Sequence, residues 1–377
     1  MKTAPAILII LVGMTSQAGA QDFVDSVREL NAAQNRMAVG KEKARDQVAA
    51  QFDAIEALAP GVEPEAWAQS RNIRAATIYL LSGGAPEGLR EIHDAGFIVG
   101  DESALLEAAL LNAEGDEHAT EKISAFEPAN YPPLLAGHLA LVQGGALVGR
   151  DNPRAIASLD LARLLMPTTL VEEAAIRREI KALDPGRDRE KIISLAQTYA
   201  AKYQASPYAR NFIADVRAII FGPVIKADMA FVSKIAAIID IAPAPERADI
   251  YLALCRSALL AGRFDDAHKM LAKASPAAEA ANMRDRLLAY QHVVERIEAQ
   301  TPPAPDQREE AASSSLTDED RKTVMVLHAV LSRLSKPHGE PKSPEDKAPD
   351  DPDTELVANV RARLEHVDSL LNGHKSK

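Results

Sequence analysis

Hydrophobic residues recur every three or four positions through most of the chain, with polar residues between them. Residues at this spacing fall on one face of an α-helix. Two examples are the stripes Val24, Val27, Leu30 and Val48, Phe52, Ile55, Leu58. The best candidate strand, residues 219–225, is split by Gly222 and Pro223. The pattern therefore predicts an all-α protein.

Three stretches repeat one unit, in which an apolar helix, a glycine turn, a second helix and a proline follow one another. These stretches cover residues 105–128, 134–167 and 251–276, and their turns contain Gly115, Gly149 and Gly262. The first two turn glycines are 34 residues apart, which is the tetratricopeptide period, but the third breaks this period. A hairpin cannot bury its own apolar face, so neighbouring hairpins must stack. We expect an α-solenoid of degenerate tetratricopeptide-like helical hairpins, in which each closing proline starts the next pair.

The most informative hairpin spans residues 158–183. Pro167 should end its first helix, because the residue before a proline is disfavoured in the α conformation. Thr169 should cap the second helix, and Glu172 should complete a capping box. Glu173 precedes Arg177 by four positions, the favourable order for a helix-surface ion pair. These charges predict either a solvated face or a binding surface, and the solvated face is the simpler interpretation.

The composition favours closely packed helices and an acidic surface. Apolar residues make up 47% of the chain, aromatic residues only 4%, and the formal net charge is -11. Such a charge argues against binding to nucleic acid or to an anionic membrane.

Residues 1–20 have the pattern of a signal peptide. Lys2 precedes the apolar run 6–14, and Ala18-Gly19-Ala20 forms a small-residue cleavage site. The alternative is a retained membrane anchor, but the run is too short for a permanent span. We expect cleavage after Ala20, export to the periplasm and no stable membrane insertion.

The mature chain divides by composition into a helical body and a tail. The body covers residues 21–300. The tail comprises a flexible linker (301–315), an amphipathic helix (316–335), a disordered linker (336–353) and a C-terminal amphipathic helix with its end (354–377). The two tail helices either dock on the body, pair with each other or await a partner.

The sequence shows no motif of a catalytic or metal-binding site. The nine histidines are scattered without zinc-site spacing, and Cys255 lies in an apolar helix, where a lone cysteine is usually a small buried residue. Glu102-Ser103 resembles the catalytic dipeptide of lytic transglycosylases, but the downstream loop of those enzymes is missing. We expect Asp101 or Ser103 to cap a helix there. The sequence predicts no enzyme, no cofactor and no metal site.

One further cluster lies in a helix predicted over residues 65–81. Trp67, Arg71 and Arg74 fall on one side of that helix by their spacing. Tryptophan and arginine are frequent at binding hot spots. The alternative is that Trp67 fills the joint between two helical pairs, which we prefer.

Two segments, 67–86 with Arg71-Asn72 and 161–180 with Ala162-Arg163-Leu164-Leu165, resemble the MotC family of periplasmic flagellar motility proteins from alphaproteobacteria. The similarity covers about residues 22–300. Where that family has Pro-Gly-Thr, this chain has Pro167-Thr168-Thr169.

The resemblance implies an accessory protein that flagellar rotation requires and that binds the periplasmic domain of the stator protein MotB. It carries over no catalytic residue. The candidate residues for partner contact or for fixing the scaffold are Trp67, Arg71, Arg163, Glu172, Glu173, Arg177 and Arg178. The oligomeric state that we expect is a monomer. The alternatives are a generic periplasmic helical-repeat adaptor for envelope assembly and a peptidoglycan-acting enzyme.

Overall fold

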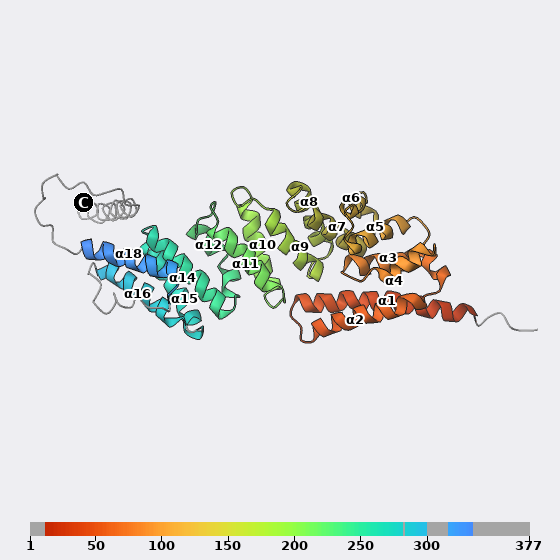
Figure 1. The fold of residues 1–377 in the computed structure, drawn as a ribbon, viewed down its shortest axis with the longest axis horizontal. Coiled ribbons are helices and arrows are strands. Elements are labelled where there is room, and N and C mark those ends of the chain that lie inside the picture. Colours follow the sequence, from red (N-terminus) through yellow and green to blue (C-terminus); the bar gives the residue numbers. More distant parts are fainter. Residues whose placement is uncertain (1–11, 282, 300–315, 335–377) are drawn as a thin grey trace, which may run out of the picture. The chain divides into compact units, whose positions relative to one another are not determined.

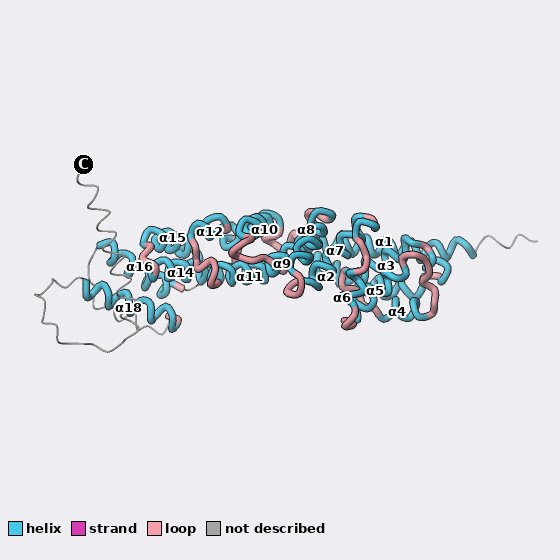
Figure 2. The backbone as a smooth tube through the Cα atoms, turned by 90° about the horizontal axis from the view of Figure 1, so that it is seen from above, coloured by secondary structure: helices cyan, strands magenta, loops and turns pink. Residues whose placement is uncertain are grey.

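The computed structural model describes residues 12–281, 283–299 and 316–334. This part of the chain contains helices and loops but no strand, as Figure 2 shows. The all-α prediction is therefore confirmed. The predicted linkers 301–315 and 336–353 and the helix over 354–377 lie outside the described residues, as does most of the leader's apolar run.

The chain forms two compact units, Met1–Ile219 and Ile220–Lys377. The first unit begins with two long helices, α1 (Val12–Ala38) and α2 (Ala44–Leu58), which lie side by side (Figure 1). The predicted cleavage point after Ala20 lies inside α1.

The remaining helices of the first unit follow in short succession. They are η1 (Ala59–Gly61), η2 (Pro64–Ala68), α3 (Ser70–Leu81), α4 (Glu87–Asp94), α5 (Ser103–Glu114), α6 (Ala119–Ser124), η3 (Pro128–Asn130), α7 (Pro133–Leu147), α8 (Asn152–Leu165), α9 (Leu170–Ala182), α10 (Arg189–Lys202) and α11 (Ala209–Phe221), which crosses the unit boundary after Ile219. The pairs α5–α6 and α7–α8 turn at Gly115 and Gly149, whose φ angles are 74° and 79°. These left-handed values favour glycine, which has no Cβ to clash. Both predicted hairpin turns are confirmed.

Two glycines of α7 let α8 and the chain after it approach closely. A Cβ on Gly144 would lie 2.6 Å from Leu159 Cγ, and one on Gly137 would lie 2.3 Å from Met166 Cγ. Both distances are well below a van der Waals contact. The small residues of α7 therefore fix the position of the 158–183 hairpin.

The second unit contains the third predicted hairpin. Its helices are α12 (Met229–Lys234), α13 (Ala236–Asp240), α14 (Ala244–Leu260), α15 (Phe264–Ala280), α16 (Arg284–Ala299) and α18 (Asp318–Leu334). The pair α14–α15 turns at Gly262, with a φ of 68°. The stacking of the hairpins into a tetratricopeptide-like solenoid remains a prediction.

Helix α18 lies where the sequence predicts an amphipathic helix over 316–335, and it docks on α14 and α16. Asp320 is fully buried at this contact. It accepts hydrogen bonds from Tyr290 Oη at 2.5 Å and Thr317 Oγ1 at 2.6 Å, and Arg286 Nε lies 2.7 Å away. Of the three alternatives for this helix, the structure shows docking.

Three local predictions are wrong. Pro276 does not end its helix, since α15 continues to Ala280. An internal proline costs about 3 kcal/mol, and the burial of Ala274, Ala277 and Ala278 on both sides of it favours continuation. Asp101 and Ser103 do not cap α5: Glu102 is its N-cap residue and makes no capping hydrogen bond. Its carboxylate instead lies 2.7 Å from Arg74 Nε.

The prediction of one continuous helix over 65–81 is also wrong, because an extended residue interrupts the helix. Residue Gln69 is extended (φ −88°, ψ 124°) and separates η2 from α3. Trp67 thus lies on a 3₁₀ turn and is fully buried, with its ring 5.3 Å from that of Phe23 at an interplanar angle of 74°. Arg71 and Arg74 lie on α3, so the three residues do not share one helix face. Trp67 is therefore a core residue, while its place at a joint between two helical pairs remains a prediction.

Candidate functional site

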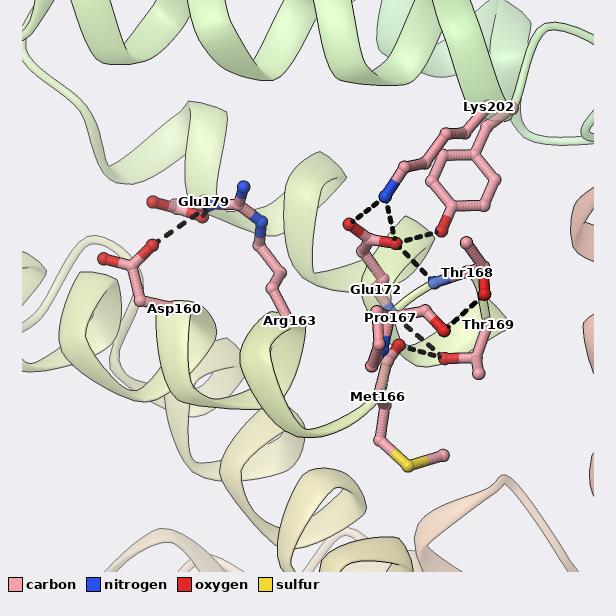
Figure 3. A network of polar contacts seen from close by, with 10 residues as sticks. Asp160, Arg163, Met166, Pro167, Thr168, Thr169, Glu172, Glu179 and Lys202 are labelled. Carbon is pink, nitrogen blue, oxygen red and sulfur yellow. Dashed lines mark hydrogen bonds and ion pairs between the residues drawn. The ribbon is translucent and has the colours of Figure 1, made fainter.

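The turn between α8 and α9 is built by its own side chains (Figure 3). Thr169 Oγ1 donates a hydrogen bond to the Met166 carbonyl at 2.6 Å and accepts one from the Glu172 N–H at 3.4 Å. Glu172 Oε2 accepts from the Thr168 N–H at 2.6 Å. The predicted cap at Thr169 is confirmed. The return bond of the capping box goes to Thr168, one residue earlier than a standard box.

Thr168 occupies the left-handed region, with a φ of 61°. A β-branched residue is strained there because its Cβ approaches the backbone. This is the position at which the resemblance noted above has glycine. Two hydrogen bonds hold Thr168 in this conformation. Its N–H donates to Glu172 Oε2, and its Oγ1 donates to the Pro167 carbonyl at 2.6 Å.

Helix α9 carries three buried glutamates, Glu172, Glu173 and Glu179, with exposed fractions of 5%, 0% and 0%. We call these glutamates and their bonded partners the α9 network. Burying a carboxylate is costly unless cations and hydrogen-bond donors surround it. The partners of each glutamate therefore decide whether its carboxylate can remain charged.

Glu172 binds the end of α10. Its carboxylate lies 3.0 Å from Lys202 Nζ and accepts a hydrogen bond from Tyr203 Oη at 2.6 Å (Figure 3). Burial opposes ionisation, but the bonds from Tyr203, from the Thr168 N–H and from Lys202 outweigh it and lower the pKa of Glu172. The carboxylate is thus held in its charged form.

Glu173 gathers donors from its own helix, from α10 and from the loop after α10. Arg177 Nε lies 2.9 Å from both carboxylate oxygens, which confirms the predicted ion pair. Tyr199 Oη donates at 2.5 Å and Ser206 Oγ at 3.1 Å. Burial first, and then the charge of Glu173, raises the pKa of the Tyr199 hydroxyl, so Tyr199 remains a donor.

Glu179 binds α8 and the start of α10. Its carboxylate lies 3.0 Å from Arg163 Nη1 and 2.6 Å from Lys191 Nζ. Both cations also contact Asp160, at 3.1 and 2.6 Å (Figure 3 shows the Arg163 contact). Burial raises the pKa of Glu179, while Lys191 and Arg163 act in the opposite direction.

The α9 network therefore fixes α8, α9, α10 and the following loop as one body. Breaking a buried ion pair by removing one partner costs about 3–5 kcal/mol, so these contacts resist rearrangement. The arrangement presents no activated nucleophile and no pair of carboxylates sharing a proton.

The predicted site residues divide into three groups. The α9 network contains Arg163, Glu172, Glu173 and Arg177. Trp67 belongs to the core, and Arg71 reaches α1, where its Nη1 donates to Gln21 Oε1 at 3.2 Å. Arg178 is exposed and donates to the Leu141 carbonyl at 3.3 Å. Contact of any of them with a partner remains a prediction.

Sequence reasoning missed the partners supplied by α10 and its following loop. These are Lys191, Tyr199, Lys202, Tyr203 and Ser206. The four-residue spacing of the two tyrosines indicates only a helix face. Nothing in the sequence pairs Glu172 with a lysine 30 positions later.

The described residues include no group of three or more His, Cys, Asp or Glu side chains that could hold a metal ion. Cys255 is buried in α14, and burial raises the pKa of its thiol. This thiol is a small core group, as predicted. Within the described part, no helix is both long and apolar enough to cross a membrane.

Two comparisons with known proteins point to the same family. The family model described as "Chemotaxis protein MotC" matches residues 2–376. A protein of Rhizobium meliloti (strain 1021) named "Chemotaxis protein MotC" is 26% identical over 334 residues, which cover 87% of this chain and 76% of the relative. No solved structure matches the chain. The chain belongs to the MotC family.

Proposed function

We propose that this protein is a motility protein that acts as a periplasmic scaffold and binds the periplasmic domain of the stator protein MotB, so that the flagellar motor can rotate. The family match over residues 2–376 is the observation that carries this proposal. The name of the Rhizobium meliloti relative, a chemotaxis protein, supports a role in motility.

The α9 network supports action by binding rather than by catalysis. A surface held by buried ion pairs is preorganised, and a preorganised surface loses less entropy when a partner binds. Three separate elements meet at Glu172, Glu173 and Glu179 and cannot shift independently. In this proposal the network keeps the binding surface in one shape, and the partner contacts exposed residues around it.

Export with cleavage after Ala20 is part of the proposal. Cleavage would shorten α1 so that it begins at Gln21, and Phe23, Val27 and Leu30 would still be buried in the core. Cleavage would also remove the small Ala20 side chain, which is 1% exposed. N-terminal sequencing of the protein from a periplasmic fraction should begin at Gln21.

An in-frame deletion in a motile host tests the function. We expect cells with intact but paralysed flagella, and rotation should return when the full-length gene is supplied. Normal swimming of the deletion strain would refute the motor role. Defects in division or in the cell wall with normal motors would favour an envelope adaptor or a peptidoglycan-acting enzyme.

A further inference from the structure

An open cleft of about 750 Å³ lies in the first unit, next to the α9 network. It is formed where α3, α5 and α7 end and where the second half of α9 passes them. The cleft is lined by Leu80, Leu81, Ser82, Gly83, Gly84, Asn112, Ala113, Val142, Gly145, Ala146, Val148, Arg178 and Lys181. Its volume is in the range of ligand-binding pockets.

The ionisable groups of this lining are both cationic, although the chain as a whole carries a net charge of -11. They are Arg178 and Lys181, from consecutive turns of α9. Lys181 Nζ lies 3.4 Å from Asp215. Among the described residues, Arg178 forms no ion pair, and its one hydrogen bond goes to the Leu141 carbonyl at 3.3 Å.

The shape of the cleft depends on the placement of Arg178. Its side chain lies along the backbone of Gly145, where a Cβ would come within 3.2 Å of Cδ and 3.3 Å of Nε. Arg178 is exposed, and the one bond from its Nη1 to the Leu141 carbonyl fixes the guanidinium. Burial, followed by repulsion from Arg177, lowers the pKa of Arg178. A cation in this position is stabilised by an anion that enters the cleft.

Ser82 is another polar residue of this lining. The hydroxyl oxygen of Ser82 is buried and makes no hydrogen bond within the described structure. Buried hydroxyls normally have a partner. The cleft thus offers a guanidinium and a hydroxyl beside the apolar side chains of Leu80, Val142 and Val148.

We infer that this cleft binds an acidic, partly apolar peptide segment of a partner protein, with a carboxylate of the segment facing Arg178. Charge complementarity selects a carboxylate, because a guanidinium can bind one with two parallel hydrogen bonds. A small-molecule ligand is normally enclosed over most of its surface, whereas this cleft is open at Gly83, Arg178 and Lys181, which are exposed. A segment attached to a folded partner needs no such enclosure. This inference goes beyond the proposed function, since it holds for whichever protein carries the segment.

A random heptapeptide library displayed on phage tests the inference. The mature protein is used as bait, and clones that also bind the Arg178→Gln variant are removed. We expect the remaining clones to be enriched in Asp or Glu next to aliphatic residues. Recovery of no Arg178-dependent clone, or of clones without acidic enrichment, would overturn the inference.

A recovered peptide is then labelled with fluorescein and its affinity is measured by anisotropy, beside an analogue in which each acidic residue is replaced by its amide. The acidic peptide should bind about tenfold or more tightly than the analogue, as is typical of one charged hydrogen-bonded contact. Arg178→Gln should abolish this preference, and Arg178→Lys should restore part of it.

Arg154→Gln is the matched control, because Arg154 is an exposed α8 arginine outside the cleft lining. This variant should keep the full preference for the acidic peptide. Circular dichroism verifies that each variant is folded. An equal loss of this preference in Arg154→Gln would show that the overall charge of the protein causes it, and would contradict a site at Arg178.

Discussion

Replacing Glu173 by alanine is expected to destabilise the first unit strongly, because three donors lose one common acceptor. The Glu173 carboxylate accepts from Tyr199 at 2.5 Å, from Ser206 at 3.1 Å and from Arg177 at 2.9 Å, and its side chain is 0% exposed. Without it, a buried hydroxyl pair and a cation that is 22% exposed remain unsatisfied.

The size of the effect follows from these contacts. Removing one partner of a buried ion pair costs about 3–5 kcal/mol. Domains are stable by only about 5–15 kcal/mol, so the variant should lose a large fraction of the free energy of unfolding. Tyr199→Phe removes a single donor and leaves the other two bonds, and should cost about 1–2 kcal/mol.

Urea denaturation followed by tryptophan fluorescence measures this effect in the correct unit. The chain has one tryptophan, Trp67, which is fully buried in the first unit. Its emission therefore reports unfolding of the unit that contains Glu173. Circular dichroism followed in parallel reports both units.

Asp25→Ala provides the matched carboxylate control. Asp25 pairs with Arg28 at 2.6 Å, but both side chains are more than half exposed, and such surface pairs contribute little. Its unfolding midpoint should equal that of the wild type. A Glu173→Ala variant that loses less than about 1 kcal/mol would refute the conclusion that the α9 network holds the hairpin.

Three further predictions follow from single positions. Thr168→Gly should be more stable than Thr168→Ala by about 1 kcal/mol in the same urea assay, because only glycine relieves the positive φ. Gly144→Ala should cost about 1–3 kcal/mol by overpacking against Leu159, whereas Gly88→Ala in α4, with nothing within 4 Å, should not destabilise. Buried Asp320 has a pKa lowered by its bonds to Thr317 and Tyr290 and by Arg286, which outweigh its burial. Its contribution is therefore complete above about pH 4 and lost as the pH falls through its folded-state pKa. The protection of α18 amides, taken relative to the intrinsic exchange rate at each pH, should fall on acidification in the wild type, and it should already be low at pH 7 in Asp320→Asn.

Local physical rules predicted much of the fold from the sequence. The turns at Gly115, Gly149 and Gly262 were predictable because a helix that ends in a left-handed residue favours glycine. The cap at Thr169 was predictable because its hydroxyl satisfies a free N–H two or three residues on. These features depend on residues within one or two helical turns.

Features that depend on distant residues were not predictable. Pro276 is tolerated in α15 because of packing, and the extended Gln69 that breaks the helix over 65–81 places Trp67 beside Phe23. The charges of α9 suggested a solvated face by their spacing. Glu172 and Glu173 are nevertheless buried, because α10 supplies their partners from about 30 positions away.

A calorimetric titration of the MotB periplasmic domain into the mature protein beginning at Gln21 tests the proposed function most directly. We expect saturable binding, and Glu173→Ala should weaken it at a temperature where the variant is still folded. Absence of binding between two folded proteins would refute the proposed MotB-binding role.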